Sequence, residues 1–287
     1  MDVIIKSQKD YSKLFYQVLN ETEKREVNLY LYLTFLHPMD VVVLAEFIIY
    51  SLKKGIEVTL TVNNSEVKKY LSAIGLLEFC SKNYQEPSEI IEIPSFTAMP
   101  LRRVNRETMV YYIQRTQDYF QAFCPGKDLG MLNITISELV NNVYDHSESP
   151  IDSYVFSQFY PNLNKIKIAV SDLGNGIPRT VNRFFQGKGF DLLSQVDAVK
   201  WALRLNSTTK SMPHNAGRGL DTINSFVYAN NGEWSLFTDQ IQMISKNGKP
   251  RFAKNSIDYF VGTVIEISID INNLESLESQ DFLDWEF

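Results

Sequence analysis

The sequence contains few of the residues that build covalent or metal-bound frameworks. Its 287 residues include two cysteines, Cys80 and Cys124, and three histidines. Two cysteines are too few for a disulfide framework or a cysteine-rich zinc site, and His146 and His214 are too scattered for a zinc motif. We therefore expect a cytoplasmic, reducing setting.

Long apolar runs are also absent. The longest run, 41–50, contains Glu46 and is much shorter than the ~20 residues that a membrane-spanning helix needs. Lys6 and Lys9 interrupt the apolar residues at the beginning of the chain, so we expect no signal peptide. The sequence predicts no membrane span.

An excess of positive charge is missing too. The chain has 28 basic and 34 acidic residues, a formal net charge of −6. Six of the acidic residues and none of the basic ones lie in 270–287, so the rest of the chain is balanced. A balanced body does not indicate a nucleic-acid-binding surface, which is normally basic. The acidic tail, 271–287, is either a solvated segment or a docking peptide, and the sequence leaves both open.

The first part of the chain, 1–85, has the pattern of a small α/β domain. Alternating β-formers predict strands, and apolar residues at helical spacing predict helices. The predicted order is strand 27–35, helix 39–52, strand 56–62 and helix 63–71.

A second domain is expected over 109–270, after a linker at 86–108 that contains three prolines. Its predicted helices are 110–123, 133–146, 196–205 and 219–229, and its predicted strands are 153–160, 165–171, 233–238, 241–244 and 257–269.

One predicted helix of this domain carries a polar face. Glu138, Asn142 and Asp145 fall at i, i+4 and i+7 and therefore share one side of the helix. A carboxylate and an amide one turn apart can position a water and offer oxygen ligands to Mg²⁺. An ordinary solvated helix face has the same pattern.

A second grouping follows a predicted strand. Asp172 stands at the strand end, where a carboxylate can accept hydrogen bonds from a ligand amino group, and Gly174 and Gly176 let the backbone approach that ligand closely. Most glycine pairs of this kind are ordinary turns, and no Rossmann or Walker fingerprint is present.

Two further glycine positions complete the pattern. Gly217 and Gly219 precede a predicted helix whose N–H groups can bind an anion, and Arg218 can add positive charge. Gly262 and Thr263 lie within a predicted strand, where a lone glycine usually marks a bulge or close packing.

Together the four groupings resemble the GHKL ATPase superfamily, which includes DNA gyrase B subunits, heat-shock chaperones, histidine kinases and MutL proteins. The resemblance covers about 110–270. It implies a Bergerat-type α/β sandwich, a mixed sheet with helices on one face, that binds ATP and Mg²⁺. The matching groupings are Glu138-x-x-x-Asn142, Asp172-x-Gly174-x-Gly176-Ile177-Pro178, Gly217-Arg218-Gly219-Leu220 and Gly262-Thr263.

The resemblance also implies a role for each matched residue. Asn142 would coordinate Mg²⁺, and Glu138 would act as general base on the attacking water or hydroxyl. Asp172 would recognise the adenine amino group, and Thr263 would join the water network around adenine. The other candidate ligand contacts are Asp145, His146, Gly174, Gly176, Ile177, Gly217, Arg218, Gly219 and Leu220, together with Lys188, Thr208, Thr209 and Lys210 in an expected lid at 187–216.

The sequence departs from the histidine-kinase pattern in two places. Asp221 stands where those kinases often carry another glycine, which puts a kinase-type lid in doubt. His37, followed by Pro38, ends a predicted strand and does not lie on a phosphoacceptor helix. We therefore do not expect a conventional sensor histidine kinase.

The first domain is similar to the STAS domains of anti-sigma-factor antagonists, most closely over 61–79. In those antagonists a serine at the start of the first helix is phosphorylated. The corresponding run, 37–46, contains neither serine nor threonine, so we do not expect such a switch here. A generic α/β domain that packs against the ATPase is the alternative.

Three uses of the site stay open from the sequence. The first is a conformational ATPase or regulator whose lid closes on ATP and changes an interface with a protein partner or within a homodimer. The second is an anti-sigma-factor-like serine/threonine kinase that acts on a STAS partner, and the third is a non-enzymatic ATP sensor. Glu138 favours an enzyme that performs hydrolysis or phosphotransfer.

Overall fold

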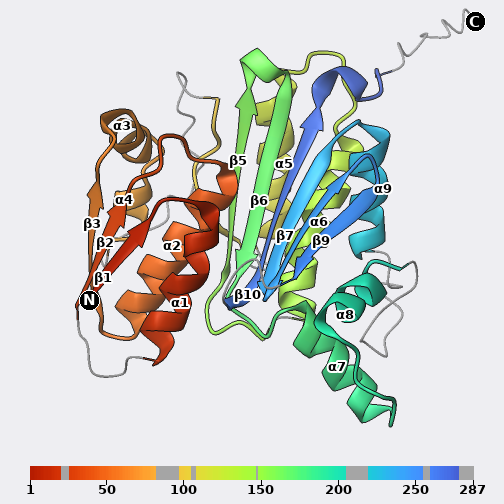
Figure 1. Cartoon of the computed structure of the whole chain (residues 1–287). Helices are drawn as coiled ribbons and strands as arrows, with labels where there is room; N and C mark the ends of the chain where they lie inside the picture. Colours follow the sequence, from red (N-terminus) through yellow and green to blue (C-terminus); the bar gives the residue numbers. More distant parts are fainter. Residues whose placement is uncertain are drawn as a thin grey trace, which may run out of the picture.

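The structure is a computed structural model that describes residues 1–20, 26–81, 97–104, 108–146, 148–204, 219–254 and 259–277. Figure 1 shows a three-stranded sheet near the N-terminus, a seven-stranded sheet beside it, and helices between and around them. The α/β fold class expected from the sequence is confirmed. No helix in the described ranges is long and apolar enough to span a membrane.

The small sheet is parallel, with the strand order β1-β2-β3. The four elements predicted for this region are present. Two further elements, β1 and α1, were not predicted; β1 has only four residues, too few to show a clear alternation. The elements are β1 (Asp2–Ile5), η1 (Gln8–Asp10), α1 (Tyr11–Asn20), β2 (Glu26–Leu31), α2 (Pro38–Lys53), β3 (Glu57–Val62), α3 (Ser65–Ala73) and α4 (Leu76–Phe79).

Helix α2 is apolar on nearly all sides because it lies between the two sheets (Figure 1). Every residue from Val41 to Phe47 is buried. The helix begins with Pro38, whose missing N–H costs no hydrogen bond in the first turn. The Asp40 carboxylate accepts the N–H of His37 at 2.6 Å and so satisfies one amide at the helix start.

The large sheet has the strand order β4-β5-β6-β10-β7-β8-β9, and every neighbouring pair is antiparallel. This corrects the expectation of a mixed sheet. The helical crossover from β6 to β7 leaves those two strands parallel, but β10 inserts between them and runs antiparallel to both. The strands are β4 (Arg102–Val104), β5 (Ser153–Tyr160), β6 (Lys165–Asp172), β7 (Glu233–Asp239), β8 (Ile241–Lys246), β9 (Lys249–Lys254) and β10 (Phe260–Asp270).

Helices from the second part of the chain lie over one face of the large sheet, as expected, and α1 and α2 from the first part cover the other face. Tyr154 and Phe156 of β5 pack into the core that contains α1 and α2, and Val155 between them packs into the core on the opposite face. The helices of that opposite face are α5 (Met109–Gln121), α6 (Gly130–His146) and α9 (Gly219–Ala229), while α7 (Ile177–Gly187) and α8 (Gln195–Ala202) extend from one end of the sheet (Figure 1).

The first part of the chain shares a hydrophobic core with the large sheet. Phe15 of α1 makes edge-to-face contacts with Phe47 of α2 and with Phe260 of β10. Within the expected linker, 102–104 forms the edge strand β4, whereas 86–96 and 105–107 lie outside the described residues.

The beginning of the expected acidic tail is packed onto the body. Residues Ile271–Asn273 form the short helix η4, and Leu274 is buried. Lys127 Nζ donates to the Leu274 carbonyl at 2.9 Å, which ties this segment to the loop before α6. Residues 278–287 lie outside the described residues.

Candidate functional site

Asp172 is the last residue of β6, and only 4% of it is exposed. By strand alternation its side chain shares a face with Ile168 and Val170, which pack into the core formed with α5, α6 and α9. Burial raises the pKa of the Asp172 carboxyl to about 7, and the Gly174 N–H, which donates to Oδ1 at 2.7 Å, partly offsets that rise. This carboxyl therefore changes its charge near neutral pH.

The glycine turn after Asp172 leads into α7. Gly176 has a φ of 72° and precedes the helix. A Cβ at this position would lie 2.8 Å from Thr238 Oγ1, so only glycine fits without a shift. Thr238 Oγ1 in turn accepts the Ile177 N–H at 3.0 Å, which fixes the start of α7 against β7.

Gly262 and Thr263 form a bulged segment of β10 beside the same turn. Gly262 has a φ of 79°, and a Cβ there would overlap the carbonyl oxygen of Asp172. Thr263 is paired with Asp172 on one side and with Thr238 on the other. The two threonine hydroxyls are 3.3 Å apart, and Thr238 Oγ1 also donates to the Gly262 carbonyl at 3.1 Å. The structure therefore brings together the second and fourth groupings found in the sequence.

Helix α6 carries the first grouping. Glu138 and Asn142 are both partly buried, one turn apart. Asn142 Nδ2 is shielded from solvent and has no hydrogen-bond partner within the described residues, which leaves a polar group for a ligand to satisfy. The side chains of Asp145 and His146, in the last turn, lie outside the described residues.

The chain just after α6 is hydrogen-bonded to the glycine turn. Ser149 Oγ accepts the Leu173 N–H at 3.3 Å, and Glu148 Oε2 accepts from Asn175 Nδ2 at 2.8 Å. Arg183 Nη1 of α7 binds both Glu148 oxygens, at 2.7 and 2.8 Å. These contacts hold the end of α6 next to the Asp172 turn, so the first grouping joins the same end of the sheet.

The third grouping is described only in part. Helix α9 begins at Gly219 and packs beside α6, and Leu220 is partly buried against the core of that layer. Thr208, Thr209, Lys210, Gly217 and Arg218 lie outside the described residues.

Ile177 and Lys188 stand at opposite ends of α7. Ile177 starts the helix at the glycine turn and packs against the core. Lys188 follows the other end of this 11-residue helix, about 16 Å further along at 1.5 Å per residue, and lies over the ring of Phe184. Within the described residues, the structure does not bring Lys188 next to the other candidates.

A second contact at the start of α7 was not predicted from the sequence. Arg179 Nε lies 3.5 Å from Asp239 Oδ1, and the guanidinium stacks 4.8 Å from the centre of the Tyr259 ring. Asp239 is buried in a left-handed conformation with a φ of 49°, in the tight turn between β7 and β8. Neither this pair nor Thr238 belongs to a sequence motif.

Comparison with known proteins adds little to these observations. No protein-family model and no curated protein matches the sequence. Among solved structures, the chain is similar to the topoisomerase IV ATP-binding domain of Francisella tularensis in complex with a small-molecule inhibitor, at 13% identity and a TM-score of 0.30. The match covers 64% of this chain and 45% of that one.

Proposed function

We propose that the chain binds Mg-ATP at the end of the large sheet, where β6, β7 and β10 meet the start of α7 and the end of α6. One observation supports this most strongly. Asp172 and Thr263 are strand partners, and Gly176 and Gly262 leave no room for side chains beside them. Residues that are distant in the sequence thus form one surface with a buried carboxyl and a hydroxyl.

The chemistry of this surface suits an adenine ring. The carboxylate of Asp172 can accept a hydrogen bond from the exocyclic amino group, and such a bond is strong at a buried, charged acceptor. The Thr263 hydroxyl can bind a ring nitrogen directly or through a water. The glycines allow the flat ring to lie against the backbone.

The phosphates would extend towards α6 and α9. The first turn of α9, from Gly219, has N–H groups that can bind phosphate oxygens. The described residues contain no cluster of three His, Cys, Asp or Glu side chains that could hold a metal alone. Mg²⁺ commonly binds through one or two protein oxygens together with phosphates, and Asn142 Oδ1 can supply one of them. Mg²⁺ held there would neutralise phosphate charge.

The position of Glu138 suits a role as general base in ATP hydrolysis. It lies one helical turn before Asn142 on the same side of α6, where it can take a proton from a water aimed at the terminal phosphate. A regulatory ATPase fits the architecture best, because α2 packs directly against β6, the strand that ends at Asp172. Changes at the nucleotide would therefore reach the N-terminal part of the chain.

The test measures ATP affinity by calorimetry and phosphate release under saturating Mg-ATP. We expect wild type to bind and hydrolyse ATP, and Glu138→Gln to bind with little change while turnover falls by about 10²-fold or more, the usual contribution of a general base. Asp118→Asn, on the exposed side of α5, is the matched control and should behave as wild type.

Three results would count against the proposal or refine it. Wild type that does not bind ATP would refute the proposal. Loss of binding in Glu138→Gln would remove the assigned role of Glu138. Label from γ-labelled ATP that remains on protein would identify the phosphotransfer alternative, and binding without phosphate release would identify the sensor.

A further inference from the structure

In the part of the chain that the structure describes, no helix lies over one face of the small parallel sheet. Alternate residues of the three strands, including Val3, Leu29 and Leu31, are buried in the core with α1 and α2. By strand alternation the intervening side chains point away from this core, and we call them the outer face. The outer face consists of Asp2, Ile4, Lys6, Glu26, Asn28, Tyr30, Tyr32, Glu57, Thr59 and Thr61.

An open face is unusual for this kind of sheet. Parallel sheets almost always have both faces covered. The part of the outer face formed by β1 and β2 carries apolar and aromatic side chains. Ile4 of the edge strand β1 is 48% exposed and pairs with Tyr30 of β2, and Tyr32, two residues after Tyr30, is 44% exposed. Exposed isoleucine and tyrosine side chains with polar residues around them are typical of an interface.

The outer face is acidic at one end and basic at the other. Asp2, Glu26 and Glu57 lie towards the beginning of the strands. Lys6 lies at the other end, with its ammonium 5.9 Å from the centre of the Tyr32 ring. The charge of the outer face therefore changes from negative to positive along its strands.

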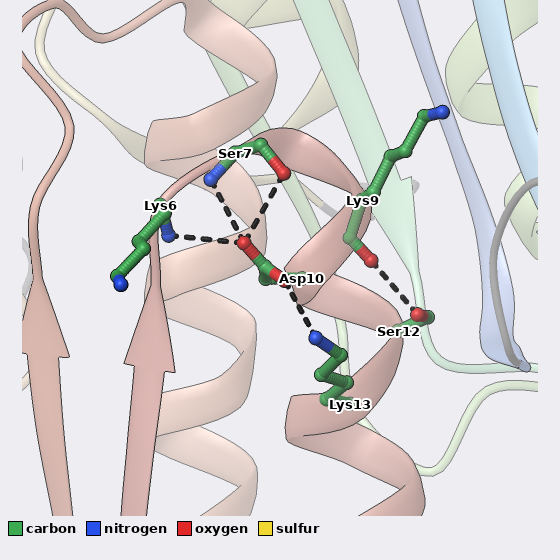
Figure 2. Close-up of polar contacts among 6 residues, drawn as sticks. All are labelled: Lys6, Ser7, Lys9, Asp10, Ser12 and Lys13. Atoms are coloured by element: carbon green, nitrogen blue, oxygen red, sulfur yellow. Dashed lines mark hydrogen bonds and ion pairs between the residues drawn. The ribbon is translucent and has the colours of Figure 1, made fainter.

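The turn after β1 keeps the charge of Lys6 available. Figure 2 shows the Asp10 carboxylate accepting the backbone N–H groups of Lys6 and Ser7, at 3.0 and 2.9 Å, and pairing with Lys13 Nζ at 2.8 Å. The ammonium of Lys6 points away from Asp10. The nearby acid is thus satisfied by Lys13, and the Lys6 charge stays beside Tyr32.

We propose that the outer face binds the outer face of a second copy of this chain, as a two-fold symmetric dimer. Asp2 and Lys6 stand two residues either side of Ile4. When a second sheet is turned so that its strands run in the opposite direction, Ile4 meets Ile4 of the other copy, and each Asp2 meets the other Lys6. The alternative two-fold arrangement, with strands in the same direction, places acidic ends together and is disfavoured.

The size of the face sets the strength of this dimer. Three strands of four to six residues, spaced about 4.8 Å apart, cover only a few hundred Å² per copy. Stable interfaces bury about 800 Å² per partner. We therefore expect a weak dimer whose population increases with protein concentration.

Sedimentation velocity of the full chain without nucleotide, from low to several hundred micromolar, tests the proposal. Ile4→Glu should abolish dimer formation, because it buries two like charges at the symmetry axis. Leu77→Glu is the matched control, since Leu77 is equally exposed, at 48%, but lies on α4 away from the outer face. It should dimerise as wild type does, and circular dichroism should show both variants folded.

Charge exchange tests the orientation. Lys6→Asp or Asp2→Lys alone should weaken the dimer, and the two together should restore it. Cross-linking gives an independent test: Cys80 and Cys124 are buried, so a short bismaleimide should join two copies of Ile4→Cys but not of Leu77→Cys.

Several outcomes would overturn the proposal. If the wild-type protein is monomeric at every concentration, the proposed dimer does not form. A dimer that survives Ile4→Glu, or that Leu77→Glu disrupts equally, uses another surface. Failure of the charge exchange to restore association refutes the proposed orientation.

Discussion

Asp172 is a buried carboxyl at the end of a strand, and its pKa of about 7 makes the proposed site sensitive to pH. Only the ionised form offers a charged acceptor to an adenine amino group. Binding that requires this form should weaken as the pH falls below 7, by up to about tenfold per pH unit, and should level off above 7. Calorimetric ATP titrations on both sides of pH 7 measure this.

Asp172→Asn is the control for this prediction. An amide does not titrate, so the variant should bind ATP more weakly and lose the contribution of residue 172 to the pH dependence. The titration of ATP itself is common to both proteins and cancels in the comparison. Wild type and Asp172→Asn with identical pH profiles would show that the Asp172 carboxyl does not contact the ligand.

At the scale of elements, the turn between β7 and β8 positions the start of α7. Thr238 binds the Ile177 N–H, and Asp239 holds Arg179. Arg179 is 58% exposed, so the pair contributes little to overall stability, about 1 kcal/mol or less. Its effect should be on the glycine turn, whose geometry the ligand requires.

We therefore expect Arg179→Ala to weaken ATP binding several-fold while the melting temperature stays nearly unchanged. Arg179→Ala combined with Asp239→Asn should cost little more in ATP affinity than Arg179→Ala alone, because both changes break one interaction. Lys200→Ala, which removes an exposed ion pair on α8, is the control and should leave the affinity unchanged. Fully additive losses of affinity would show that Arg179 and Asp239 act separately.

The elements that the sequence predicted include the apolar helix α2, the helix α6 and the strands β6 and β10, whereas α7 was not predicted. Strand β9 was missed because Pro250 and its basic residues weaken the β pattern, although an edge strand tolerates both. Spacing in the sequence made Asp172, Gly176 and Gly262 candidate site residues, and the structure brings these three together. Thr238 could not be found, because a lone threonine in a strand forms no motif, and its role depends on the register between β7 and β10. The antiparallel sheet likewise depends on the insertion of β10, a long-range pairing.

In the whole molecule, α2 joins the two sheets. Its first turn is attached to the large sheet, where the Met39 N–H donates to Glu266 Oε2 at 2.9 Å and Lys167 Nζ lies 3.6 Å from Glu266 Oε1. Further along, its apolar residues pack against β5 and β6. The helix that covers the small sheet therefore also covers the strand that ends at Asp172, and the N-terminal part of the chain is integral to the folded body.

Glu46 lies in the middle of this helix and is fully buried, with neither carboxyl oxygen hydrogen-bonded within the described residues. Burial raises the pKa of Glu46 well above its usual range, and the nearby Asp172 carboxylate adds to the rise. The folded state thus holds the proton more tightly than the unfolded state. Stability should fall as the pH rises above the unfolded pKa, by up to about 1.4 kcal/mol per unit from this group, until the folded pKa is reached.

Glu46→Gln keeps the size of the side chain and removes its titration. We expect urea unfolding to give similar stability for wild type and Glu46→Gln near pH 5, and a growing advantage for Glu46→Gln as the pH is raised towards about 9. Contributions from other buried carboxyls, such as Glu266, are common to both proteins and cancel. Glu57→Gln, on the exposed side of β3, should keep the wild-type slope. The contrary outcome is that Glu46→Gln shows the same pH dependence of the free energy of unfolding as wild type. That result would mean that Glu46 is ionised in the folded protein. The contact between α2 and β6 would then have to contain a compensating positive charge or water.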